Sequence, residues 1–154
     1  MPYNQDYLTG NAREGADCNV ADDFNLTDTE KLNLKNIADA FHAKGKPFIV
    51  IMNIGGGIET ASWRNNADTI LLAWQPGLEA GSSVADVLTG LVNPSGKLAY
   101  TFPVKYEGEP TAKNFPNSGG NRDEVIYEEG IDVGYRYFNS FGVKPAYPFG
   151  YGLS

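Results

Sequence analysis

The sequence predicts an α/β fold, a three-layer α/β/α sandwich with a mostly parallel sheet. Residues 47–54 (PFIVIMNI) and 70–74 (ILLAW) are unbroken apolar runs, the pattern of strands buried on both faces. Apolar residues then recur at helical spacing over residues 79–91, and a third apolar segment follows at 98–102. Helices cross between the first two strands, so we expect these strands to be parallel and all three to share one sheet.

The first helix is predicted between Phe24 and Gly45. Thr27 is its N-cap, and Glu30, three residues later, completes a capping box. Lys44 followed by Gly45 suits the C-terminal end of a helix. The apolar face is predicted to comprise Leu34, Ile37, Ala38 and Phe41.

Three glycines at 55–57 follow the first strand and lead into a short helix expected over residues 58–66. Strand, glycines and helix in this order could cradle a phosphate, so a nucleotide-binding α/β domain is one alternative. The glycines match neither GxGxxG nor GxxxxGK[ST], however, and no lysine follows them. A turn that clears space at the sheet edge is the stronger interpretation.

Glycine and proline residues bound the second helix. Gly90 closes or nearly closes the helix of residues 79–91, and NPSG at 93–96 is turn chemistry that leads to the third apolar segment. Residues 104–123 are rich in Gly, Pro, Asn and Ser and lack periodicity, which predicts a long loop.

Length and charge restrict the classes of partner. With 154 residues the chain can bury one sizeable core, so we expect residues 1–154 to form a single domain. The net charge is −7 and no lysine and arginine cluster could follow a phosphate backbone, so nucleic acid is not an expected partner. No apolar run approaches the roughly 20 residues of a membrane span, and no membrane partner is expected.

Cys18 is the single cysteine, which excludes an internal disulfide and leaves the redox compartment undetermined. Residues 1–10 lack the basic and apolar regions of a signal peptide. We expect a soluble chain whose localisation is unknown. The sequence is compatible with a longer parent protein that is secreted or periplasmic.

Several ordered motifs carry a family resemblance. They are W-x-P-G from Trp74, G-x-x-x-A-D-V-L-x-G from Gly81, NPSGKL from Asn93 and TFP from Thr101. Together they closely resemble the C-terminal α/β sandwich domain of glycoside hydrolase family 3, which contains β-glucosidases and β-xylosidases. The segments EVIYEEGIDVGYRY at 124–137 and YPFGYGL at 147–153 are similar to the same family.

Glu14 is the candidate catalytic residue. It lies in NAREGADCN, residues 11–19, and matches the glutamate that serves the family as general acid/base. Arg13 stands where the family usually has glycine, and Cys18 where it usually has arginine. A glutamate must have its pKa raised, by burial or by a neighbouring carboxylate, before it can donate a proton to a departing oxygen. Without the resemblance, a solvated loop glutamate would be the expected reading.

Other ionisable residues are expected to be structural or solvated. His42 is the single histidine and has no Cys, Asp or Ser at a motif spacing, so we interpret it as a helix-end residue. Glu128 and Glu129 are adjacent, and neighbouring side chains of an extended segment point to opposite faces. They are therefore not expected to share a substrate atom.

The resemblance runs from about Glu14 to Leu153 and implies one part of a larger enzyme. In the family, strand and helix material precedes the Glu14 loop, and a barrel domain supplies the aspartate nucleophile. The implied function is hydrolysis of terminal β-linked glucosides, xylosides or oligosaccharides with retention, Glu14 acting as acid/base without metal or organic cofactor. The isolated chain is expected to be inactive. A non-catalytic carbohydrate-binding or interaction module is the alternative from another class.

Overall fold

A computed structural model describes residues 24–114 and 126–153 of the chain. The predicted loop of residues 1–23, which holds Glu14, lies outside the described residues. The chain divides into two compact units: unit 1 extends to Gly96 and includes Leu153, and unit 2 comprises Lys97–Gly152. Each unit is described by itself.

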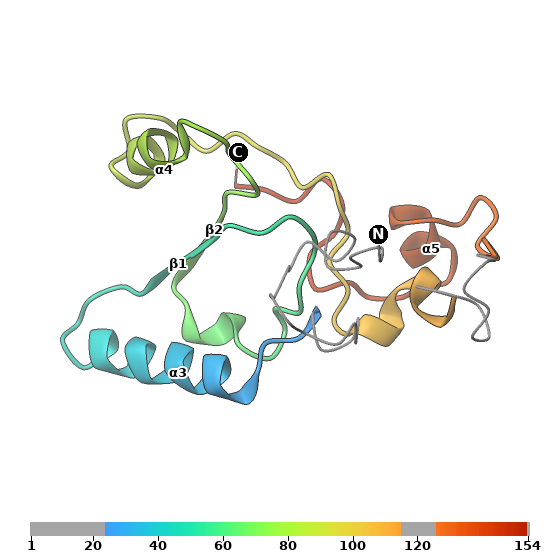
Figure 1. Cartoon of the computed structure of the whole chain (residues 1–154), viewed down its shortest axis with the longest axis horizontal. Coiled ribbons are helices and arrows are strands. Elements are labelled where there is room, and N and C mark those ends of the chain that lie inside the picture. Colours follow the sequence, from blue (N-terminus) through green and yellow to red (C-terminus); the bar gives the residue numbers. More distant parts are fainter. Residues whose placement is uncertain (1–23, 115–125, 154) are drawn as a thin grey trace, which may run out of the picture. The chain divides into compact units, whose positions relative to one another are not determined.

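The predicted first helix of unit 1 is confirmed as α3, Asp28–His42 (Figure 1). Thr27 Oγ1 accepts a hydrogen bond from the Glu30 N–H at 3.3 Å, and the Glu30 carboxylate accepts from the Thr27 N–H at 2.7 Å. These reciprocal bonds satisfy two N–H groups that a helix start would otherwise leave without partners. Ala38 is buried, whereas Ile37 and Phe41 are nearly half exposed, so the predicted apolar face is covered only in part.

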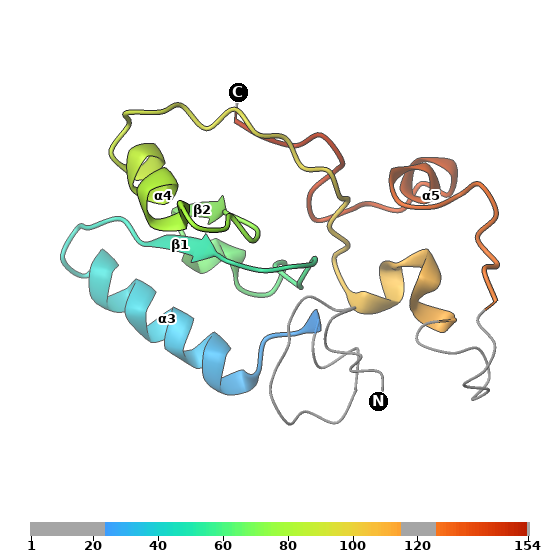
Figure 2. The same cartoon turned by 45° about the horizontal axis from the view of Figure 1, so that its top comes forward.

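The first two predicted strands pair in parallel, as expected. They are β1, Ile49–Met52, and β2, Thr69–Leu72, with Ile49 opposite Thr69 and Met52 opposite Leu72. Figures 1 and 2 both place α3 on one side of this pair and α4, Ala80–Leu88, on the other. Helices on both sides of a parallel strand pair confirm the α/β class.

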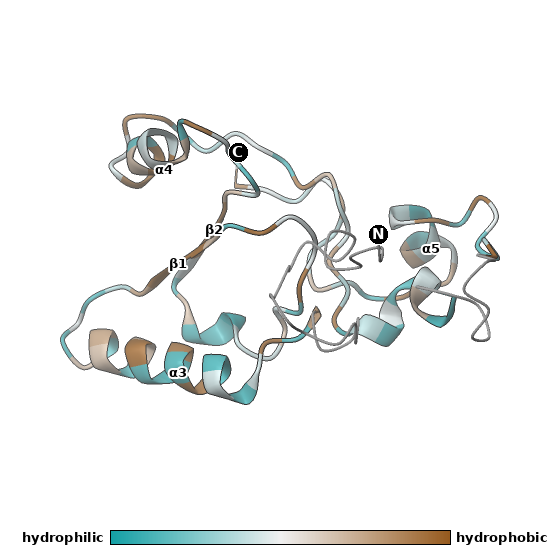
Figure 3. Ribbon diagram, viewed as in Figure 1, coloured by the Kyte–Doolittle hydropathy of each residue, from teal (hydrophilic) through white to brown (hydrophobic). Residues whose placement is uncertain are grey.

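The two strands are less buried than their apolar sequences predict. Ile49 and Ile51 of β1 are 41% and 45% exposed, whereas Val50 and Met52 on the other face turn toward the core. Residues 70–72 of β2 are half-buried, so burial on both faces is not observed. Within residues 24–114 and 126–153 no third strand joins the sheet. Figure 3 shows the apolar character of both strands in brown.

The core of unit 1 gathers where β1 meets the segment that follows it. Met52, Ile58 and Trp63 are all at least nine-tenths buried, and Leu34 of α3 and Leu72 of β2 pack against them. This burial explains why the expected helix over residues 58–66 is wrong. Residues 58–60 have no regular structure, residues 61–63 form a turn, and only Arg64–Asn66 form a 3₁₀ helix.

The turn between α4 and unit 2 lies earlier than predicted. Gly90 takes a φ of 79°, a left-handed conformation that glycine adopts without steric cost, and it ends the helical region. Leu91, which was expected on the helix face, lies beyond α4 and is 78% exposed. NPSG at 93–96 has no regular secondary structure.

The predicted third strand, residues 98–102, does not join β1 and β2. In unit 2, the Leu98 N–H donates to the Tyr151 carbonyl, and Phe102 forms an antiparallel bridge with Tyr147. The backbone groups of this segment therefore pair with the end of the chain. The apolar pattern identified an extended segment, but it could not identify the pairing partner.

Unit 2 contains turns and short helices. The first part of the predicted 104–123 loop holds two 3₁₀ turns, Tyr106–Gly108 and Pro110–Lys113, while residues 115–123 lie outside the described part. The helix α5, Tyr135–Ser140, was not predicted. Aromatic side chains link these pieces: the Phe102 ring lies edge-on to Tyr100 and Tyr147, with centroids 5.4 and 6.1 Å away.

None of the helices in the described ranges is long and apolar enough to cross a membrane.

Candidate functional site

Glu14, the predicted acid/base, lies outside the described residues together with Arg13 and Cys18. Phe24 stands ten positions after Glu14 and is buried. Its carbonyl accepts a hydrogen bond of 2.8 Å from the Glu59 N–H. The chain that leaves the Glu14 segment is therefore fixed, at Phe24, to the segment that follows β1.

The carboxyl ends of parallel strands are the usual place for ligand sites in α/β folds. β1 and β2 are parallel, so the segments that follow them leave from the same edge of the sheet. Glu59 lies in the first of these segments, and Trp74 lies in the second. Glu59 and Trp74 are therefore candidate site residues.

Glu59 is a buried carboxylate whose oxygens are both occupied. Its Oε1 accepts from the Ser62 N–H and its Oε2 from the Ser62 hydroxyl, each at 2.6 Å. The Glu59 carbonyl also accepts from Trp63 Nε1 at 2.7 Å. These bonds fix the turn that brings Trp63 into the core, which favours a structural role. Glu59 and Ser62 stand in the reverse order of a capping box, so no capping motif in the sequence indicates this contact.

Trp74 follows β2 in a strained conformation. Its φ is 55°, which is uncommon for any residue except glycine and costs of order 1–3 kcal/mol. The preceding Ala73 N–H donates to the Met52 carbonyl at 2.9 Å, so the strand pairing continues up to this point. The chain therefore turns sharply at the carboxyl end of β2, beside a partly exposed indole.

The structure does not favour the phosphate cradle at 55–57. A dinucleotide or phosphate loop places its glycines directly before a helix, whose free N–H groups bind the anion. Here the glycines lead into residues 58–60, which have no regular structure, and the next helix, a 3₁₀ helix, begins only at Arg64. The nucleotide-binding alternative therefore lacks its main geometric requirement.

His42 lies at the C-terminal end of α3, as predicted, but it has a partner that its sequence spacing did not reveal. Its Nε2 lies 2.8 Å from Asp68 Oδ2, and the same oxygen accepts the Phe48 N–H at 2.7 Å. The Phe48 hydrogen bond, followed by that of His42, lowers the pKa of Asp68. This cluster ties the helix end to the beginnings of both strands and is structural.

Glu128 is exposed and Glu129 half-buried, in a segment without regular structure. In unit 2, Glu109 is a half-buried carboxylate. It accepts a hydrogen bond from the hydroxyl of the half-buried Tyr100. Burial raises the pKa of Glu109, and burial together with the Glu109 charge raises that of Tyr100. Sequence analysis missed this pair because its members are nine positions apart without a motif.

No cluster of His, Cys, Asp and Glu able to hold a metal ion occurs among residues 24–114 and 126–153. The described residues therefore contain carboxylates in structural roles and one aromatic residue, Trp74, in a strained conformation. The predicted acid/base, Glu14, precedes them in the sequence.

Comparisons with known proteins identify the family. Residues 4–154 match the glycosyl hydrolase family 3 C-terminal domain. Beta-glucosidase A of Butyrivibrio fibrisolvens is 44% identical over 138 residues, which is 86% of this chain and 16% of that protein. An exo-alpha-(1->6)-L-arabinopyranosidase of Bifidobacterium longum is 40% identical over 129 residues, 82% of this chain and 17% of that protein.

Among solved structures, beta-glucosidase 3B of Thermotoga neapolitana in complex with glucose is similar, with a TM-score of 0.79 and 53% sequence identity. The match covers 85% of this chain and 18% of the Thermotoga chain. The chain thus spans less than a fifth of the length of these relatives. The resemblance seen in the motifs is confirmed, and the chain belongs to glycoside hydrolase family 3, to the C-terminal domain of that family.

Proposed function

We propose that this chain is the C-terminal part of a retaining β-glycosidase, and that Glu14 is its general acid/base. The family match over residues 4–154 carries the proposal, because it includes the Glu14 segment as well as the described α/β region. The chain spans 16% of its Butyrivibrio relative. The aspartate nucleophile that the family resemblance implies would therefore come from a barrel domain outside these 154 residues.

The chemistry requires two carboxyl groups about 5 to 5.5 Å apart across the glycosidic bond. The barrel aspartate attacks the anomeric carbon, the bond to the aglycone oxygen breaks, and Glu14 gives its proton to that oxygen. Glu14, now a carboxylate, takes a proton from the water that displaces the aspartate. Sugar, free nucleophile and protonated Glu14 are regenerated, and neither a metal nor an organic cofactor takes part.

The proposed substrates are terminal β-linked glucosides, xylosides or short oligosaccharides. The relatives support a pyranoside substrate, since they include beta-glucosidases and an arabinopyranosidase. The second relative also indicates that the sugar must be determined by assay on a panel of pyranosides.

The test uses a chimera in which residues 1–154 replace the corresponding segment of the Thermotoga enzyme, whose 53% identity favours correct assembly. With Glu14→Gln, we expect hydrolysis of a substrate with a poor leaving group to fall about 10²–10⁴-fold. An activated dinitrophenyl glycoside should lose much less in the bond-breaking step, because its leaving group departs without a proton. Added azide should restore turnover by attacking the covalent intermediate.

Glu128→Gln in the same chimera is the matched control and should leave both rates unchanged. Equal loss on the two substrates, or no effect of azide, would show that Glu14 is not the acid/base. The isolated chain should not hydrolyse an aryl β-glucoside above background, since no covalent glycosyl intermediate can form without the nucleophile.

A further inference from the structure

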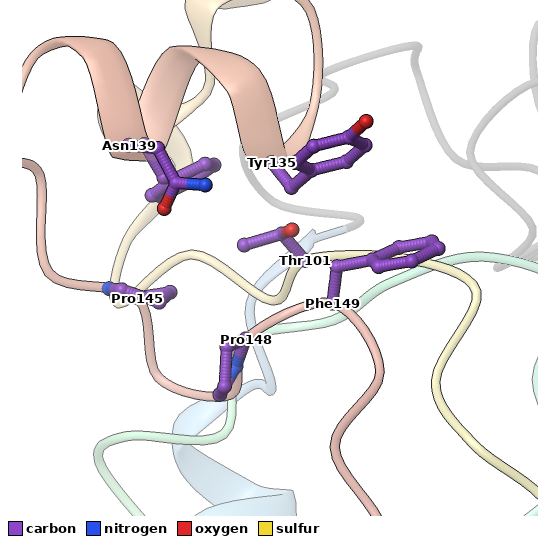
Figure 4. A pocket seen from close by; sticks show the side chains of 7 residues that line it. Thr101, Tyr135, Asn139, Pro145, Pro148 and Phe149 are labelled. Carbon is purple, nitrogen blue, oxygen red and sulfur yellow. The ribbon is translucent and has the colours of Figure 1, made fainter.

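Unit 2 contains a small open pocket beside α5. It has a volume of about 110 Å³. Figure 4 shows side chains from α5 on one side of it and side chains of the chain end on the other, with Thr101 between them. The labelled residues are Thr101, Tyr135, Asn139, Pro145, Pro148 and Phe149.

The pocket holds a polar group without a partner. Thr101 is 3% exposed, and its Oγ1 makes no hydrogen bond within the described structure. A buried hydroxyl in this state costs about 1–3 kcal/mol relative to a satisfied one. Thr101 lines the pocket, so rotation about its χ1 can turn the hydroxyl toward an occupant. Such an unsatisfied group calls for an explanation by a bound molecule or a functional role.

Two aromatic rings form the apolar part of the rim. The centroids of Tyr135 and Phe149 lie 5.1 Å apart with an interplanar angle of 34°. They pack against each other but are still 42% and 51% exposed, so part of each side chain can contact a ligand. The buried Phe138 and two prolines add rigid walls. Asn139 supplies an amide that both donates and accepts hydrogen bonds.

Among residues 24–114 and 126–153, no charged side chain lines this pocket, which favours a neutral ligand. We propose that the pocket holds one pyranose ring of a β-linked glycan and serves as a non-catalytic sugar site. A β-pyranose with equatorial hydroxyls presents an apolar face of axial C–H groups, which fits against an aromatic ring. Its hydroxyls donate and accept, as do Asn139 and Thr101. The volume suits a single ring, and the remainder of a glycan would extend into solvent.

The site goes beyond the proposed catalytic role, and only the choice of a β-glucoside as probe rests on that role. A proline-containing peptide is the competing ligand, because aromatic and proline walls also bind polyproline segments. The buried hydroxyl distinguishes the two, since a proline ring offers no hydrogen-bonding group to it.

The test is a titration of the full 154-residue chain with cellobiose, followed by amide chemical shifts. We expect saturable shifts at Thr101 and Asn139 with a millimolar dissociation constant, since one ring buries little surface. Tyr135→Leu and Phe149→Leu should each weaken binding about tenfold. Tyr127→Leu is the matched control, because Tyr127 is 84% exposed and does not line the pocket, and it should leave affinity unchanged.

Thr101→Val separates ligand binding from structure. The variant replaces the unsatisfied hydroxyl with a methyl group of similar size, so the unfolding midpoint should not fall, whereas cellobiose affinity should drop about fivefold. Unchanged affinity in this variant, equal effects of Tyr135→Leu and Tyr127→Leu, or shifts caused only by a proline-rich peptide would each overturn the proposal. The titration measures binding to the 154-residue chain and requires no hydrolysis, so its outcome is independent of the Glu14 test.

Discussion

Unit 1 and unit 2 are each stabilised internally by a different kind of contact. Unit 1 has a cap, a periodic helix and two paired strands whose apolar residues meet in the core of Met52, Ile58 and Trp63. Unit 2 has no strand pair longer than the single bridge of Phe102 and Tyr147 in its described part, and aromatic contacts connect its short turns. Local periodicity therefore specifies the first unit, whereas contacts between distant segments specify the second.

The largest expected effect tests the core of unit 1. Trp63 is 2% exposed, and its indole N–H is bonded to Glu59. Trp63→Ala should lower the free energy of unfolding by about 3–5 kcal/mol, because it leaves a cavity and an unpaired carbonyl. Urea denaturation followed by circular dichroism measures the change.

Leu91→Ala is the control for this core, since Leu91 is 78% exposed, and it should change stability by less than about 0.5 kcal/mol. A loss below about 1 kcal/mol for Trp63→Ala would mean that the core does not determine the stability of unit 1.

The next effect tests the aromatic contacts of unit 2. Phe102→Leu keeps an apolar side chain but removes two edge-on contacts, with Tyr100 and Tyr147. We expect a loss of about 1–3 kcal/mol, since each aromatic pair contributes about 0.5–1.5 kcal/mol. Hydrogen exchange should accelerate at the Phe102 amide and stay unchanged at Ile51 of β1. Phe141→Leu, at a 63% exposed ring, is the same chemical change with a smaller expected effect. Equal acceleration in both units would show that they unfold together.

The predictive success of the sequence follows the same division. The capping box of Thr27 and Glu30 and the parallel pairing of residues 49–52 with 69–72 were predicted, because they depend on local spacing and on chain direction. The prediction that residues 98–102 join the sheet as a third strand was wrong. An apolar pattern does not encode which segment accepts the backbone hydrogen bonds of such a strand. Helix α5 is too short for helical periodicity to be detected.

The candidate site was predictable in part. Family motifs identified the domain and indicated Glu14, which stays a prediction because it lies outside the described residues. The pairing of His42 with Asp68 could not be predicted, because 26 positions separate them. Glu59 was missed because the expected 58–66 helix did not indicate the hydrogen bonds that its carboxylate accepts from Ser62.

The smallest effect concerns two carboxylates whose pKa values move in opposite directions. In unit 1, the Phe48 N–H and then His42 lower the pKa of Asp68 below its ordinary value of 3.8. In unit 2, burial raises the pKa of Glu109 above its ordinary value of 4.5, although the Tyr100 hydrogen bond opposes this. A lowered carboxyl pKa contributes stability above the unfolded pKa, and that stability is lost as pH falls through the folded pKa. A carboxyl pKa that is raised in the folded state contributes stability at pH values below the unfolded pKa. This stability is lost as pH rises through the pKa of the folded state.

The two units should therefore respond oppositely to mild acid. As pH falls from about 5 through the folded pKa of Asp68, Asp68→Asn should reduce the acid-induced loss of stability, since the variant no longer carries the carboxylate that acid protonates. Glu109→Gln should gain stability relative to the native chain as pH rises, because its amide accepts the hydrogen bond of the Tyr100 hydroxyl without burying a charge.

Titration of the side-chain carboxyl ¹³C shifts measures each midpoint, expected below 3.8 for Asp68 and above 4.5 for Glu109. A midpoint above 3.8 for Asp68 would contradict the first assignment, and one below 4.5 for Glu109 would contradict the second. In the double variant the two effects should add, since the carboxylates lie in different units and share no partner. Strong non-additivity of the two stability changes would mean that the units are energetically coupled. Unit 1 could then no longer be distinguished, as a unit specified by local pattern, from unit 2, as one specified by distant contacts.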